Sequence, residues 1–313
     1  IGIMPGWTGP VLIVMAVTGS IGIALLLWWE VRTPERRLSD FSLKVRDLVM
    51  LIAIGVILQL ILMGVFQPIF RYFNVVKEMG LWLRILAIAP LFIGMYVGIR
   101  LVGRLWRWAS VRRVFVFGLL TVAASTALLA IRPASMPYWF QLFPLLLFGF
   151  AIQSTKTVWS NAFFQTVVDD FIGLNAAIQN ATLQIGGSLG ALLSGQLVIL
   201  FGYRAFSARL APFASVGETR RIYEIFSSSF TREDALIAAN LSTLGTIAWE
   251  QYVAAFAASF GRTLLVMVVI ALVAAVLVHF FVRPNIRFTG QAATVDLAAS
   301  VFEDLYLYRH GSR

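Results

Sequence analysis

Residues 48–67 read LVMLIAIGVILQLILMGVFQ, and residues 263–282 read TLLVMVVIALVAAVLVHFFV. As a helix, each stretch can cross the hydrocarbon core of a bilayer, which takes about 20 apolar residues. Five further stretches share this pattern: residues 10–29, 85–103, 114–131, 138–159 and 181–201. Because lipid offers the backbone no hydrogen-bond partner, each span must be helical. The sequence therefore predicts an all-α polytopic membrane protein with about seven transmembrane helices.

The composition excludes several other classes of protein. Of the 313 residues, 59% are hydrophobic and 13% are charged, and the mean hydropathy is +0.85. A soluble domain carries about a quarter charged residues. The chain has no cysteine and only two histidines, His279 and His310, so thiolate chemistry is excluded and neither a metal nor another cofactor is expected. The net charge of +10 lies in short clusters between apolar runs, which indicates contacts with lipid headgroups rather than with nucleic acid.

The distribution of lysine and arginine predicts the orientation. Short cytoplasmic loops carry an excess of these residues. Thirteen of them fall in the 30–47 and 104–113 loops and in the tail after residue 282, whereas four fall in the short connections on the other side. The long connection 203–262 is left out of the count, because long segments cross the membrane largely regardless of their charge. We therefore expect a multi-pass protein of the cell (inner) membrane with a cytoplasmic C-terminus.

The predicted spans divide the chain into three parts. Residues 1–47 are expected to form a linker transmembrane helix and a cytoplasmic loop, residues 48–283 a six-helix bundle, and residues 284–313 a cytoplasmic tail. The connection 203–262 is expected to be an extracytoplasmic helical segment. Within it, Thr231–Asp234 resembles a capping box. Apolar residues then recur at helical spacing and predict an amphipathic helix on the outer membrane face: Ile237, Leu241, Leu244, Ala248 and Phe256.

Polar residues inside the spans are candidates for function, because burying them in a membrane is costly. They concentrate in two spans, as Gln59, Gln67, Gln153, Lys156 and Thr157. At 100° per residue, the last three and Ser160 fall within an arc of about 100° on one helix. One interpretation is an aqueous cavity that these side chains line. The other is that Lys156 extends to the headgroups from near a helix end.

Small residues in the sixth predicted span indicate close helix packing. These glycines are Gly186, Gly187, Gly190 and Gly195. Glycines four residues apart let two transmembrane helices approach closely. A phosphate-binding loop is excluded, because no strand precedes the glycines and no lysine follows them.

Several motifs together resemble the major facilitator superfamily, in particular its fourteen-helix drug:proton antiporter branch. The first are Gly6-Trp7 with Pro10 and Gly19, Glu30-Val-Arg-Thr-Pro34, Leu38–Phe41, Gly80 and Pro90. The family's cytoplasmic loop motif is similar to Gly103-Arg104-Leu105 with Arg112-Arg113 and Gly118. Its entry to the thirteenth helix is similar to Gly173 followed by Gln184–Gly190 and Gly195. The motifs occur in the family's order over nearly the whole chain.

The resemblance implies a secondary active transporter rather than an enzyme. It implies proton-coupled export of small organic compounds by alternating access, with protons and a small-molecule substrate as partners besides the lipid bilayer. It also implies an N-terminal bundle that precedes this chain, and we expect the sequence to start inside a longer protein. The loop motif departs from the family at Arg107, where an acidic residue is usual, and at Ser110, where glycine is usual.

Two other classes remain as alternatives. A seven-helix receptor or sensor would share the number of spans, although span 263–282 has no lysine for a retinal Schiff base. A membrane enzyme would need an acid–base pair, and Asp169-Asp170 is the acidic pair in the 160–180 connection. Adjacent carboxylates on a helix point about 100° apart, so they make a poor two-acid site.

Overall fold

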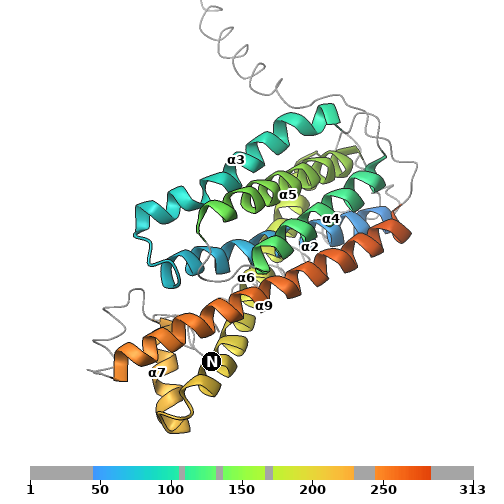
Figure 1. Ribbon diagram of the computed structural model, residues 1–313. Coiled ribbons are helices and arrows are strands. Elements are labelled where there is room, and N and C mark those ends of the chain that lie inside the picture. Colours follow the sequence, from blue (N-terminus) through green and yellow to red (C-terminus); the bar gives the residue numbers. More distant parts are fainter. Residues whose placement is uncertain (1–44, 106–109, 132–136, 166–171, 229–243, 283–313) are drawn as a thin grey trace, which may run out of the picture.

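Helices account for nearly all of the chain that the computed structural model describes, which is residues 45–105, 110–131, 137–165, 172–228 and 244–282. The long helices pack side by side in one bundle, and a short helix lies at one end of it (Figure 1). They are α2 (Val45–Val75), α3 (Leu81–Leu105), α4 (Val111–Ala130), α5 (Trp139–Gln165), α6 (Ile172–Leu210), α7 (Val216–Ser228) and α9 (Leu244–Phe281). These described residues contain no strand.

The six long helices confirm six of the predicted spans. Each is long and apolar enough to cross a membrane. Their outer faces carry exposed apolar side chains, among them Phe92 and Ile93 on α3 and Val273 and Val276 on α9. A face of this kind suits contact with lipid and not with water. The described chain is thus an all-α multi-pass membrane protein, and the predicted span 10–29 lies outside the described residues.

Two helices extend well beyond their predicted spans. Helices α6 and α9 have 39 and 38 residues. At 1.5 Å per residue each is about 57 Å long, against a hydrocarbon core of about 30 Å. Part of the connection 203–262 is therefore a continuation of these helices, since α6 runs to Leu210 and α9 starts at Leu244, and Ala248 and Phe256 are buried within α9. The predicted spans end where the hydropathy of the sequence falls, at the membrane surface. The helices continue beyond that point because their side chains still pack against neighbouring helices. Residues 229–243, which include Thr231–Asp234, Ile237 and Leu241, lie outside the described residues.

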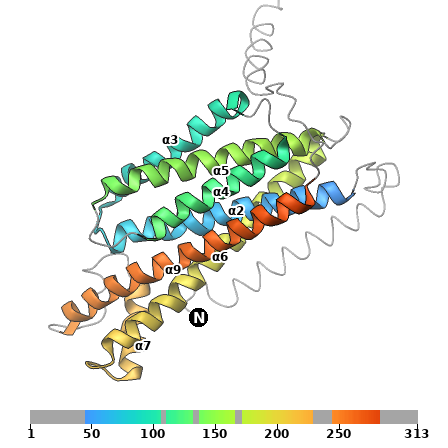
Figure 2. The ribbon, with the colours of Figure 1, turned by 45° about the vertical axis from the view of Figure 1, so that its right-hand side comes forward.

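Helix α7 packs between the projecting ends of α6 and α9 (Figure 2). It begins with a capping box that the sequence analysis missed, in which the Ser215 backbone N–H and hydroxyl donate to Glu218 at 3.0 and 2.8 Å. These hydrogen bonds hold the pKa of Glu218 below its ordinary value. The cap is therefore complete at neutral pH and is lost only as the pH falls through that lowered pKa.

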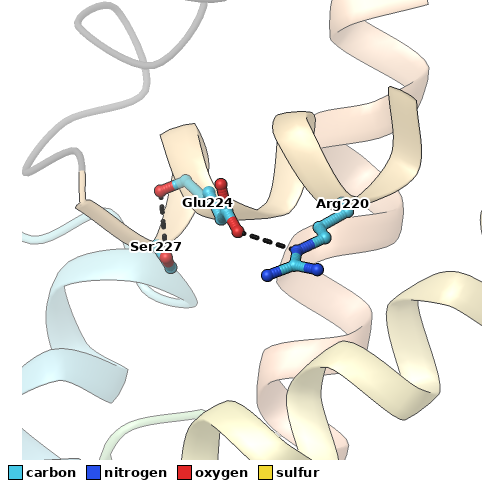
Figure 3. Close-up of polar contacts among 3 residues, drawn as sticks. All are labelled: Arg220, Glu224 and Ser227. Atoms are coloured by element: carbon cyan, nitrogen blue, oxygen red, sulfur yellow. Dashed lines mark hydrogen bonds and ion pairs between the residues drawn. The ribbon is translucent and has the colours of Figure 1, made fainter. Parts of the chain in front are cut away.

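The two faces of α7 differ in character. Its exposed face carries the Arg220–Glu224 pair, whose N–O distance is 3.0 Å, and the Ser227 hydroxyl donates to the Glu224 carbonyl (Figure 3). An exposed pair of this spacing adds only about 0.3–0.5 kcal/mol. The buried face carries Tyr223 and Phe226 against Tyr252 of α9. Aromatic packing, rather than the surface ion pair, holds α7 on the bundle.

Arg71 at the end of α2 ties this aromatic cluster to the bundle. Its guanidinium donates to the Ser227 carbonyl and lies 3.5 Å from the Tyr252 hydroxyl and 5.8 Å from the centre of the Phe256 ring. Three helices, α2, α7 and α9, therefore meet at one cation. We call this the α7 end of the bundle and the other end, where α2 and α4 begin and α9 finishes, the distal end.

The six long helices pair in a pattern with internal symmetry. Helix α2 packs on α6, α3 on α5, and α4 on α9. The first three of these helices can be exchanged with the last three, so that α2 takes the place of α5, α3 that of α6, and α4 that of α9. The α2–α6 pair then becomes the α5–α3 pair, and the α4–α9 pair becomes itself. Because each triplet has three spans, the second triplet enters the membrane from the opposite side. The α4–α5 pair likewise corresponds to α9–α2, whereas the contact between α6 and α9 has no counterpart of similar extent between α3 and α4. Apart from α6–α9, the pairing follows the exchange expected of an inverted repeat.

Glycine contacts obey the same exchange. A Cβ on Gly186 or Gly190 of α6 would clash with the backbone carbonyls of Val56 and Leu60 on α2. In the related pair, a Cβ on Gly94 or Gly98 of α3 would clash with the carbonyls of residues 146 and 150 on α5. In each triplet, the second helix has two glycines four residues apart. These glycines contact two carbonyls, also four residues apart, on the first helix of the other triplet. This close approach fixes both helix pairs.

Candidate functional site

Lys156 and Gln59 meet between two membrane-spanning helices. Lys156 on α5 donates from Nζ to the Oε1 of Gln59 on α2, at 2.9 Å, and both side chains are half-buried. Gln59 lies near the middle of α2, fourteen residues from its first residue. The structure thus brings together two of the five predicted cavity residues at about the mid-depth of the bundle.

The direction of the Lys156 side chain differs from that expected for extension to the headgroups. Lys156 lies nine residues before the end of α5, so the nearer membrane surface is at the C-terminal end of that helix. Side chains on a helix lean toward its N-terminus. Lys156 therefore leans away from the nearer surface, and its ammonium group reaches Gln59 instead.

The polar arc on α5 continues toward the distal end. The Thr157 hydroxyl donates to the Gln153 carbonyl at 2.9 Å. One turn further on, the Ser160 hydroxyl lies 3.2 Å from the Oε1 of Gln179 on α6, whose Nε2 donates to the Ser160 carbonyl at 3.3 Å. The arc thus links α5 both to α2 and to α6.

Helix α6 extends this polar surface. A Cβ atom on Gly187 would lie 3.5 Å from the Cγ of Gln59, so α6 contacts Gln59 at this glycine. Asn180 and Gln184 lie within about 60° of Gly187 around α6, and both are exposed. Exposed amides in a membrane-spanning helix are unsuited to contact with lipid. We call Gln59, Gln153, Lys156, Thr157, Ser160, Asn180 and Gln184 the polar face.

Toward the α7 end the same surface becomes apolar and aromatic. On α2, Met63, Phe66 and Phe70 follow Gln59 at helical spacing and are partly exposed. On α5, Phe150 and Phe143 lie on the same face of the helix as Thr157, within about 40° of it. The Arg84 guanidinium lies 5.2 Å from the centre of the Phe70 ring. The surface therefore offers hydrogen-bonding groups and cations beside aromatic rings, a combination that binds amphipathic organic molecules.

Two amide side chains outside the polar face have buried atoms without a hydrogen-bond partner. The Oε1 of Gln67 on α2 has none, and neither do the Oδ1 and Nδ2 of Asn175 on α6, a residue that is 1% exposed. Gln67 lies about 80° around α2 from Gln59. An unpaired buried amide costs about 1–3 kcal/mol, so a water or a ligand group at these atoms would stabilise the bundle.

The remaining predicted residues lie apart from the polar face. Gly103 is near the end of α3 with open space around it, and Arg112 and Arg113 lie in the first turn of α4. Of the predicted packing glycines, Gly195 makes no close approach to a neighbour. Gly195 follows Gly190 by five residues and so points about 140° away from the α2 contact. The side chain of Arg104 lies outside the described part.

Sequence reasoning missed Asn175 and Gln179. The sixth predicted span started at residue 181, whereas α6 starts at Ile172. Both residues therefore fell in an expected loop, where amide side chains are common and do not indicate a functional site. Gly94 and Gly98 were also missed, although their spacing is the same as that of Gly186 and Gly190.

Comparison with known proteins adds no assignment. No protein-family model matches the chain, and no curated protein matches it. Within the residues that the structure describes, no three histidine or acidic side chains lie close enough together to hold a metal ion.

Proposed function

We propose that this chain is part of a secondary active transporter that moves small organic compounds by alternating access. The observation that carries the proposal is the polar face, where Lys156 and Gln59 pair at mid-depth and where Asn180 and Gln184 are exposed among the described residues. Lipid cannot solvate such a surface, so it faces either an aqueous path or another part of the protein.

The helix pairing supports the same proposal. Inverted repeats of three helices are the building units of major facilitator transporters, in which substrate sites lie near the midplane. Helices α2 and α5 begin the two triplets, and these are the helices that carry the Lys156–Gln59 pair. A second bundle that docks on the polar face would complete a central cavity and rock against this one.

The chemistry of the face indicates the substrate class. Lys156 supplies one positive charge, the amides supply donors and acceptors, and Phe66 and Phe70 supply an aromatic wall. We infer an amphipathic anionic or zwitterionic compound, since a fixed cation disfavours lipophilic cations. Coupling to protons and the export direction follow from the resemblance to the drug:proton antiporters.

Transport by the whole protein in vesicles tests the proposal. We expect Lys156→Gln to change the rate or the substrate preference about tenfold, which corresponds to roughly 1.4 kcal/mol. Lys156→Arg should retain part of the activity, because it keeps the charge. Lys77→Gln is the matched control, since it removes the same charge from the α2–α3 connection and should leave transport unchanged.

Unchanged transport of anionic, neutral and cationic compounds by Lys156→Gln would contradict the proposal. An equal loss in Lys156→Gln and Lys77→Gln would also contradict it, since net charge and not the polar face would then determine the rate.

A further inference from the structure

An apolar groove of about 230 Å³ lies between α2, α4 and α9 near the distal end. Its walls include Met50, Ala53 and Ile57 of α2, Leu119 of α4, and Ala274 and Leu277 of α9. All nine lining residues are apolar. Ala53 and Leu277 are exposed, so the groove opens on the outer surface of the described bundle.

The chemistry of these walls excludes water as a stable occupant. An ordered water needs two to four polar partners, and an apolar cavity of this size stays dry. An empty groove would forfeit dispersion contacts along its whole length. In a membrane the medium around the helices is acyl chains, whose width and polarity suit such a groove.

A cation lies in line with the groove. Arg112 precedes Leu119 by seven residues, so it projects within about 20° of the same direction and about 10.5 Å nearer the distal end. Arg112 is half-buried, and among the side chains described at the distal end none is a carboxylate. The neighbouring Arg113 points about 100° away from this line and is exposed.

We propose that the groove binds one acyl chain of an anionic phospholipid and that Arg112 binds its phosphate. Basic sites between transmembrane helices bind anionic headgroups, and the lysine and arginine distribution predicts that this end is cytoplasmic, where anionic lipids concentrate. The site is separate from the polar face and does not depend on transport.

Native mass spectrometry of the whole protein, with thermal unfolding in a neutral detergent, tests the site. We expect one dioleoylphosphatidylglycerol to bind and raise the melting temperature more than dioleoylphosphatidylcholine does. Arg112→Gln should weaken phosphatidylglycerol binding about fivefold, whereas Arg113→Gln, the matched control, should not. Ala53→Phe should fill the groove and abolish binding of both lipids, with little change in the lipid-free melting temperature.

Three results would overturn the proposal. Equal binding by Arg112→Gln and Arg113→Gln would remove the assigned headgroup contact. Protection by inorganic phosphate equal to that by phosphatidylglycerol would mean that no acyl chain is involved. An absence of bound lipid, together with a lower melting temperature for Ala53→Phe, would mean that another segment of the protein covers the groove.

Discussion

The Lys156–Gln59 contact is the residue-scale feature on which the proposed function depends. Helical spacing alone predicted that Lys156 lies on a polar arc of α5, because the angular position of a residue follows from its number. The partner on α2 could not be predicted in this way, since it depends on how two helices far apart in sequence pack. The direction of the side chain could be decided only after both helix ends were known.

A double-mutant cycle measures this contact. Gln59→Leu leaves the ammonium group without its acceptor, so we expect it to lower stability in detergent by about 1.5–3 kcal/mol, the usual range for a hydrogen bond to a charged group. Lys156→Met leaves only a neutral amide and should cost less. The double variant should be more stable than Gln59→Leu, because it removes the unpaired cation. Additive effects, with a coupling below about 0.5 kcal/mol, would mean that the two side chains do not interact.

At the scale of elements, glycine spacing decides which helices approach closely. The sequence predicted packing through Gly186 and Gly190, and the structure places both against the carbonyls of α2. The same sequence pattern did not predict that Gly195 faces open space. A glycine has no side chain whose character indicates a face, so its role depends on the neighbouring helix, which composition does not reveal.

Two valine substitutions in α6 separate these roles. Gly190→Val would drive its side chain into the backbone of Leu60 and should lower stability by at least about 1–3 kcal/mol, the usual cost of overpacking. Gly195→Val makes the same chemical change where the structure has room, so we expect a change within about 0.5 kcal/mol. The measurement is thermal unfolding of both variants in the same detergent. Equal losses would mean that helix propensity, and not the α2–α6 contact, governs stability at these positions.

At the scale of the whole molecule, hydropathy predicted the spans but not their arrangement. The number of long helices follows from apolar stretches of about 20 residues. The symmetric pairing of the two triplets depends on contacts between backbones, and the lengths of α6 and α9 depend on packing beyond the membrane. Among these features, the polar face is the one that joins α2, α5 and α6 into a single surface.

Cysteine accessibility tests whether water reaches this surface. The chain has no native cysteine, so single substitutions report without background. Gln184 and Ile185 lie at the same depth of α6 and are both exposed, but only Gln184 is on the polar face. A maleimide reacts with the thiolate, which forms in water and not in lipid. We therefore expect a membrane-impermeant maleimide to label Gln184→Cys at least about tenfold faster than Ile185→Cys. Equal labelling would mean that water does not distinguish the two sides of α6. Labelling of Ile185→Cys alone would place the aqueous path on the Ile185 side, about 100° around the helix from Gln184.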